Sequence, residues 1–220
     1  MKKTWKFLLA GALALAMLST AASATALRLG IAYWDAGDIA DVVDDPLLGA
    51  EAVIGADLSQ YLDLELRFGC IGMWESECSH FGREYIEGTY DMTAIPLEVG
   101  LALDIPLYSG SPLHVFGGGG AGWYYFQHEL TIEQGYRHSR YHEEWSWDDH
   151  DSSFGAYAFA GVRLLLGQNV SLYGQAQYRW IFDELDLVSE GANGKDIDDS
   201  IFCGLDPSGI GFSAGIAFNF

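Results

Sequence analysis

The stretch Gly209-Ile-Gly-Phe-Ser-Ala-Gly-Ile-Ala-Phe-Asn-Phe220 decides the fold of this chain. One face of an extended strand would carry only apolar side chains, those of Ile210, Phe212, Ala214, Ile216, Phe218 and Phe220. The opposite face would carry glycine, alanine, serine and asparagine. An apolar face that ends in a terminal aromatic residue, opposite a small or polar face, is typical of a strand with lipid on one side and a wet barrel interior on the other. The stretch therefore predicts a membrane-spanning strand that closes a β-barrel.

Seven further segments alternate in the same way and predict strands at 27–34, 49–58, 62–69, 89–105, 113–131, 153–166 and 170–183. The connections alternate between short ones, near 59–61, 106–112 and 167–169, and long ones, near 70–88, 132–152 and 184–208. An even number of strands, with short turns at one end and long loops at the other, is typical of barrels in bacterial outer membranes. The predicted fold class is all-β, an eight-stranded antiparallel up-and-down transmembrane β-barrel.

The N-terminus has the three parts of an export signal. Lys2, Lys3 and Lys6 precede an apolar run over 7–18, and small-x-small cleavage motifs follow at 22–26. The run is too short to anchor the chain in a bilayer as a helix. We therefore expect residues 1–26 to be a cleaved signal peptide and residues 27–220 to be a single barrel domain.

The composition excludes two classes of protein. Without the three lysines of the signal, the formal net charge falls from −20 to about −23. The mature chain therefore lacks the basic surface that a nucleic-acid-binding protein needs. An aromatic content of 14% and 27 glycines argue for packed strands rather than acid-rich disorder. The mature sequence has no uncharged apolar stretch long enough for a membrane helix. A membrane location therefore requires a closed barrel, in which every backbone group is satisfied.

Charged residues fall on the strand faces that point away from lipid. An eight-stranded barrel has an interior just wide enough for side chains to fill, and arginine–carboxylate pairs there can satisfy one another. We predict a luminal charge network that plugs the barrel, formed by Arg28, Asp63, Glu65, Arg67, Glu98, Asp104, Arg163 and Arg179. The alternative interpretation is an ion path gated by the same network.

The glycines at 117, 119 and 122 have the spacing of a nucleotide-binding motif, but the aromatic run 123–126 continues a strand where that motif needs a helix. They predict instead either room for bulky neighbours inside a narrow barrel or a bend in the sheet.

Three segments carry a family resemblance: Ala94-Ile-Pro-Leu-Glu-Val-Gly100, Val115-Phe-Gly-Gly-Gly-Gly-Ala-Gly122 and Ala160-Gly-Val-Arg163. Together with the strand pattern of the mature chain, they resemble the eight-stranded outer-membrane barrels that include the OmpA transmembrane domain and OmpW-like proteins. The resemblance implies a monomer in the bacterial outer membrane, surrounded by membrane lipid and lipopolysaccharide. It also implies that the last strand is the signal read by the barrel-assembly machinery, carried by Phe212, Ile216, Phe218 and Phe220.

Proteins of this kind serve as structural envelope proteins, adhesins, small-solute pores or lipid A-modifying enzymes. We expect a structural or surface-interaction role, with no enzymatic activity and no cofactor beyond a divalent cation at acidic loops. A narrow pore or hydrophobic-solute transporter like the OmpW group is the first alternative, and a lipid A-modifying enzyme is the second. The enzyme hypothesis lacks an assembled triad, because Ser139 and His138 are adjacent and would point apart on an extended chain.

Two further sites are predicted in the long connections. Cys70 and Cys78 could close a small disulfide loop at a strand end, and Cys203 would then be unpaired or would replace one of them as a partner. A metal site is possible in the loop 133–151, where carboxylates offer hard oxygen ligands and two histidines would share a face in a helical turn. Its candidate ligands are His138, His142, Glu143, Asp148 and His150. The alternative for this segment is a solvated surface loop.

Overall fold

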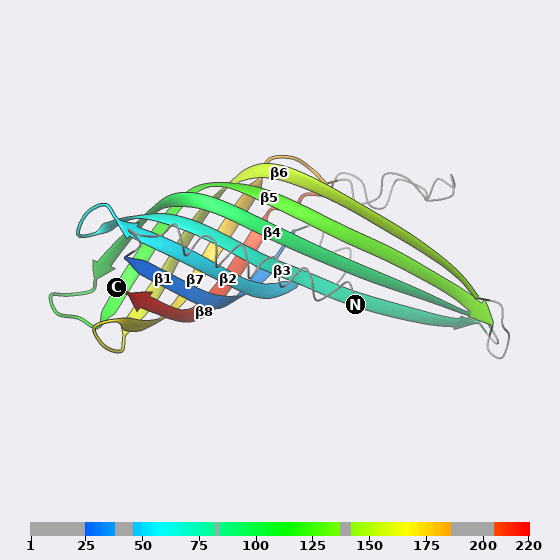
Figure 1. Cartoon of the computed structure of the whole chain (residues 1–220), viewed down its shortest axis with the longest axis horizontal. Coiled ribbons are helices and arrows are strands. Elements are labelled where there is room, and N and C mark those ends of the chain that lie inside the picture. The colour runs from blue at the N-terminus through cyan, green and yellow to red at the C-terminus, as the bar shows by residue number, and fades with distance from the viewer. Residues whose placement is uncertain (1–24, 38–45, 82–83, 137–141, 186–204) are drawn as a thin grey trace.

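The chain forms a closed ring of eight antiparallel strands (Figure 1). The computed structural model describes residues 25–37, 46–81, 84–136, 142–185 and 205–220. The strands are β1 (Ala26–Asp35), β2 (Leu47–Asp57), β3 (Leu62–Phe81), β4 (Glu84–Pro106), β5 (Leu113–Tyr136), β6 (His142–Leu165), β7 (Val170–Ile181) and β8 (Gly209–Asn219). Each strand pairs with its neighbours in the chain, and β8 pairs with β1. The predicted fold class is confirmed.

The described structure begins close to the predicted end of the signal peptide. Residues 1–24 of the predicted signal peptide lie outside the described residues, and Ala26 begins β1. Within the described residues no helix is long and apolar enough to cross a membrane.

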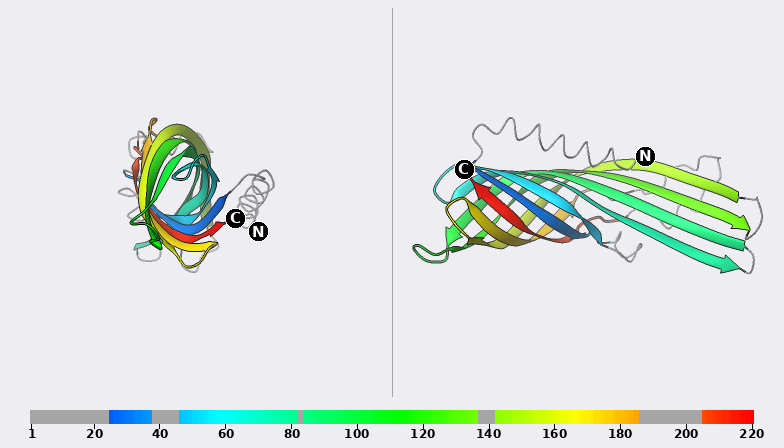
Figure 2. Two further views of the ribbon diagram at one scale, coloured as in Figure 1. Left: turned by 90° about the vertical axis from the view of Figure 1, so that its left-hand side faces the viewer. Right: turned by 60° about the horizontal axis from the view of Figure 1, so that its bottom comes forward.

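The last strand closes the barrel as its sequence predicts. One edge of β8 pairs with β7 and the other with β1, where Phe212 lies opposite Tyr33 and Ile216 opposite Leu29. Phe212, Ile216 and Phe220 are exposed on the outer surface, whereas Gly211, Ser213 and Ala217 are buried toward the lumen. The C-terminus and the start of β1 lie together at the end of the barrel with the short turns, which is the periplasmic end in such barrels (Figure 2).

Four strands are about twice as long as the other four. β3, β4, β5 and β6 have 20 to 24 residues, whereas β1, β2, β7 and β8 have 10 to 12. The extra length projects beyond the barrel as a four-stranded sheet, at the end opposite the short turns (Figures 1 and 2). We call these parts of β3–β6, residues 73–81, 84–92, 128–136 and 142–152, the projecting sheet.

The prediction of long loops at 70–88 and 132–152 is therefore wrong. The ladder of β3 and β4 continues from Trp74 opposite Asp91 to Phe81 opposite Glu84, and that of β5 and β6 continues to Gly135 opposite His142. The alternation of lipid-facing residues stops at the membrane surface, whereas backbone pairing does not depend on lipid. The sequence pattern therefore shows where the membrane ends, but it does not show where the strands end.

Aromatic residues separate onto the two faces of the barrel wall. In the run 123–126, Tyr124 and Phe126 are fully buried in the lumen, while Trp123 is partly exposed outside. On β7 and just after it, Tyr178, Trp180 and Phe182 are exposed. Exposed aromatics near the projecting end of the barrel match the girdle that such barrels place at a membrane interface.

Leu101→Arg tests the orientation of this outer face. Leu101 is exposed in the middle of the apolar stripe of β4, so the substitution is expected to destabilise the barrel by about 2–4 kcal/mol. Tyr61→Arg, at a short turn, should cost only about 0–1 kcal/mol. Urea unfolding of the protein in lipid vesicles measures both. Equal effects of the two substitutions would contradict the orientation.

Candidate functional site

Arg67 is the centre of the luminal network. Its guanidinium, which is 1% exposed, donates from Nε to Glu65 Oε2 at 3.0 Å. Its two other nitrogens donate to the side-chain oxygens of Gln177 (3.2 Å) and Gln175 (3.1 Å). Phe159 lies beneath it, with the ring centroid 3.7 Å from Cζ. Every face of this buried cation therefore meets an acceptor or a ring.

The two glutamines connect Arg67 to further carboxylates. Gln177 donates to both oxygens of Glu98, at 3.0 and 2.9 Å. Glu98 also accepts hydrogen bonds from Arg179 Nε at 2.8 Å and from Tyr124 OH at 3.0 Å. A carboxylate with three donors is satisfied in the absence of water.

Glu51 is a buried member of the network that the sequence interpretation missed. Its Oε1 accepts hydrogen bonds from Gln175 at 3.1 Å, from Ser213 at 2.6 Å and from Tyr173 at 3.4 Å. Strict alternation along β2 would have found it, since Glu51 shares the inward face with Leu47 and Val53. Three buried arginines, Arg28, Arg67 and Arg179, thereby meet three buried glutamates, Glu51, Glu65 and Glu98.

Two further ion pairs lie toward the periplasmic end. Arg28 pairs with Glu65. Asp104 pairs with Arg163 and hydrogen-bonds His114 Nδ1 at 2.7 Å. Asp63 is half-buried beside them and lines a small cavity together with Asp104 and Arg163. The structure thus places all eight predicted network residues inside the barrel, with seven of them in direct ion pairs.

The arginines also lie against aromatic rings. Arg28 lies over Phe116, with Cζ 5.1 Å from the centroid, and Arg179 lies over Trp34 at 4.8 Å. Desolvated contacts between a cation and a ring are each worth about 2 kcal/mol. They supplement the carboxylates in holding charges away from water.

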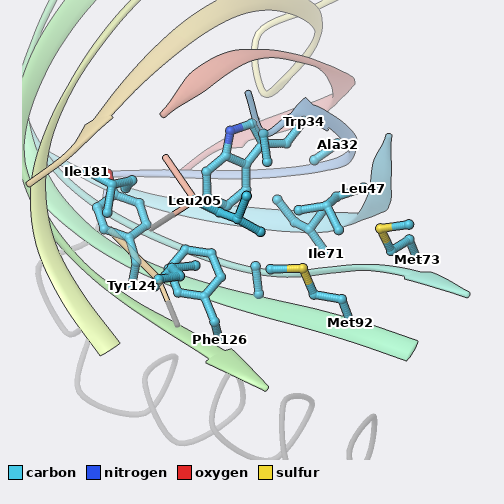
Figure 3. Packing of buried hydrophobic residues seen from close by; sticks show 13 residues of the cluster. Ala32, Trp34, Leu47, Ile71, Met73, Met92, Tyr124, Phe126, Ile181 and Leu205 are labelled. Carbon is cyan, nitrogen blue, oxygen red and sulfur yellow. The ribbon is translucent and has the colours of Figure 1, made fainter. Parts of the chain in front are cut away.

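An apolar cluster fills the lumen directly beyond Glu98, toward the projecting sheet (Figure 3). Trp34 packs against Tyr124 and Phe126, with ring centroids 6.2 and 6.0 Å apart. The other labelled members of the cluster are Ala32, Leu47, Ile71, Met73, Met92, Ile181 and Leu205. Trp34, Tyr124, Phe126, Ile71 and Met92 have no exposed surface. Charged and apolar side chains therefore occupy successive levels of the barrel.

Inward glycines make the space that these rings occupy. A Cβ at Gly100 would meet the Tyr157 hydroxyl, and one at Gly30 would meet the Tyr173 hydroxyl. At Gly122 it would lie 2.8–2.9 Å from the ring of Tyr124. Of the three glycines at 117, 119 and 122, Gly122 thus leaves room for a bulky neighbour, whereas a Cβ at Gly117 or Gly119 would first meet a backbone oxygen of β6.

The projecting sheet has two edges without a neighbouring strand in the described residues. β2 last pairs with β3 at Gly72, and β7 last pairs with β6 at Gly155. Phe154 still accepts a hydrogen bond from Phe182 N–H at 3.0 Å. Because backbone groups alternate along an antiparallel strand, those of Ser152, His150 and Ser146 face the same open edge as those of Phe154.

Aspartates cap the part of this edge nearest the barrel. His150 N–H donates to Asp149 Oδ1 at 2.8 Å, and Ser152 N–H donates to Asp151 Oδ1 at 2.6 Å. Protecting an edge in this way is a common defence against unwanted strand pairing. In the described residues Ser146 N–H has no such local acceptor and no neighbouring strand.

The outer face of the projecting sheet carries acidic residues in register. Asp91, Glu129 and Asp148 lie opposite one another on β4, β5 and β6. Like charges directly opposite on neighbouring strands destabilise a sheet. The row therefore favours contact with cations.

The predicted disulfide between Cys70 and Cys78 is wrong. Both residues belong to the continuous strand β3. Eight residues of strand span about 26 Å at about 3.3 Å per residue, whereas a disulfide needs Cα atoms within about 7 Å. Cys203 lies outside the described residues.

The predicted metal ligands lie mostly on a strand rather than on a helical turn. His142, Glu143, Asp148 and His150 belong to β6, and His138 lies outside the described residues. Asp148 accepts a hydrogen bond from Gln127, and the ring of His150 lies 6.0 Å from that of Tyr125. No three metal-ligating side chains come together in the described residues. Residues 137–141, where a helical turn would bring His138 and His142 onto one face, lie outside the described residues.

Comparison with known proteins places the chain in a family. The outer membrane protein beta-barrel domain matches residues 7–219. The chain belongs to this family. It is an outer-membrane β-barrel protein of a bacterial cell, as the sequence predicted. A comparison with curated proteins gives no match.

Solved barrels share the fold at low sequence identity. OprG from Pseudomonas aeruginosa is 12% identical with a TM-score of 0.52, over 90% of this chain and 97% of that one. A major outer membrane protein from Thermus thermophilus is 17% identical with a TM-score of 0.50, over 89% of this chain and 99% of that one. These similarities concern the fold alone.

Glu98→Ala tests the energetics of the network. It leaves Arg179 buried without its carboxylate, for which we expect a loss of about 3–5 kcal/mol in the free energy of unfolding. The exposed Asp148→Ala should change it by no more than about 0.5 kcal/mol. Urea unfolding in lipid vesicles compares them, and a loss below about 1 kcal/mol for Glu98→Ala would contradict the role given to this carboxylate.

Proposed function

We propose that this protein is a non-enzymatic surface-interaction barrel. The barrel anchors the chain in the outer membrane, and the open edge of β6 in the projecting sheet binds an extended segment of a partner protein. The observation that carries the proposal is that β3–β6 outrun the other four strands by about ten residues each. Lipid does not require this length, since about 9–11 residues cross a bilayer.

Edge pairing suits this part of the molecule physically. A peptide that adds a strand gains backbone hydrogen bonds along the edge, and side chains on alternating positions give specificity. The Asp91, Glu129 and Asp148 row favours basic residues in the partner. The net charge of −20 would steer such a partner toward the protein.

A closed lumen complements this role. The charged residues of the network neutralise one another, and the cluster around Trp34, Tyr124 and Phe126 fills the next level. An ion would have to leave its hydration shell to pass these rings, which is costly in an apolar setting. This weighs against the narrow-pore alternative.

Binding of a short labelled peptide with alternating lysine and valine tests the proposed edge. Ser146→Pro removes an outward N–H from an edge position, where proline is tolerated. It should weaken binding about tenfold, as expected from losing one or two hydrogen bonds of about 0.5–1.5 kcal/mol each. Fluorescence anisotropy with the protein in lipid vesicles measures the affinity.

The matched control is Ser152→Pro, because the N–H of Ser152 is already donated to Asp151. It should bind the peptide like the wild type. Equal weakening by both prolines, or no peptide binding by the wild type, would overturn the proposed edge.

Planar-bilayer recordings test the closed lumen. The wild-type protein should give no steady openings. Steady openings that are abolished by Glu98→Ala, or changed by Arg163→Ala, would establish a pore through the network instead.

A further inference from the structure

The projecting sheet has two chemically different faces. Its outer face carries the row of Asp91, Glu129 and Asp148. Its inner face continues the wall of the lumen, since the ladders of β5 with β4 and with β6 run without interruption from the barrel into the sheet (Figure 2). Successive side chains of a strand alternate between the two faces of a sheet. A strand added at the edge of β6 would therefore have one side in each of these settings.

The inner face is apolar along β5 and β6. Phe126 is buried in the lumen, so alternation along β5 places Leu130 and Ile132 on the same face. Ile132 lies opposite Trp145 on β6, and Leu130 lies opposite Trp147. Leu130, Ile132 and Trp145 are half-buried. Each therefore keeps apolar surface that a further side chain could remove from water.

The hydrogen-bonding phase of β6 brings Trp145 close to a strand paired at this edge. The backbone groups of Ser146 face the edge, as those of Phe154 do. In an antiparallel pair, the residue opposite Ser146 would form a hydrogen-bonded pair, with Cα atoms about 5.5 Å apart. The residue opposite Trp145 would form a non-hydrogen-bonded pair at about 4.5 Å, where side chains are closer. The added strand would therefore make its closest side-chain contact on the inner face.

The outer face sets a different requirement for the same strand. The residues opposite Ser146 and Asp148 would lie on the outer face, beside the exposed carboxylate of Asp148. Opposite charges on neighbouring strands stabilise a sheet, and like charges destabilise it. Basic residues therefore fit on this face. A charge opposite Trp145 would instead have to give up water against an apolar surface, which is costly.

We propose that the partner segment is an amphipathic β-strand, with basic residues on its outer face and β-branched or aromatic residues on its inner face. The inference rests on the proposed function, because it names the class of sequence that the edge of β6 selects. Trp145 contacts the apolar face of the bound strand, and Asp148 contacts its basic face. Pairs of an aromatic with a β-branched residue, and pairs of opposite charge, both stabilise neighbouring strands.

Two peptides of equal length and charge test the apolar face. One alternates lysine with valine, and the other alternates lysine with threonine, which is also β-branched but carries a hydroxyl. Fluorescence anisotropy with the protein in phosphatidylcholine vesicles measures both affinities, and protein-free vesicles give the signal due to lipid alone. The wild type should bind the lysine–valine peptide about tenfold more tightly than the lysine–threonine peptide.

Trp145→Thr removes the apolar contact and keeps a β-branched residue in the strand. It should lower the preference for the lysine–valine peptide from about tenfold to about threefold or less, and leave the affinity for the lysine–threonine peptide within about twofold of the wild type. The matched control is Trp74→Thr, because Trp74 is 61% exposed on β3, at the other edge of the sheet. It should bind both peptides like the wild type.

Three results would overturn the amphipathic strand and leave the edge of β6 as the binding site. They are equal affinity of the wild type for the two peptides, equal weakening of both peptides by Trp145→Thr, and loss of the preference in Trp74→Thr as well. Binding of neither peptide by the wild type would overturn the proposed edge together with this inference. The two failures are therefore distinguishable.

Discussion

Pairing of β8 with β1 is the constraint on which the rest of the structure depends. In hydrocarbon every backbone N–H and C=O must find a partner within the protein, and only a closed sheet provides this at both edges. Ten residue pairs, from Ala26 with Asn219 to Asp35 with Ile210, make the closure. Closure with eight strands then leaves an interior that side chains must fill. The outward apolar stripes and the inward polar residues both follow from that single requirement.

Charged side chains that pair with one another fill much of this interior. Arg67 reaches Glu98 through Gln177 and Glu51 through Gln175. The amides can accept from a cation with one atom and donate to an anion with the other. Buried charges are costly unless they are paired and hydrogen-bonded, and this arrangement provides both. Aromatic rings lie against the guanidinium groups of the three buried arginines.

The same strands have two different environments along their length. Within the membrane, β3–β6 are held on both sides by neighbours. Beyond it, they form a sheet with no further strand at its edges among the described residues, and its edge on β6 is capped at His150 and Ser152. A sheet edge at a cell surface is either protected or used for pairing. On this edge the aspartates cap backbone groups near the barrel, and the backbone groups farther out are those proposed to pair with a partner strand.

The sequence by itself determined the closed eight-stranded barrel, its lipid-facing residues and the inward position of residues such as Arg67 and Glu98. Side-chain alternation with a period of two records which face meets lipid, so these features can be read locally. Only the tertiary structure decided that β3 and β4 continue past the membrane, that Cys70 and Cys78 lie far apart on one strand, and which partners on other strands Glu51 meets. Those features depend on the register between strands distant in sequence, which no local pattern encodes.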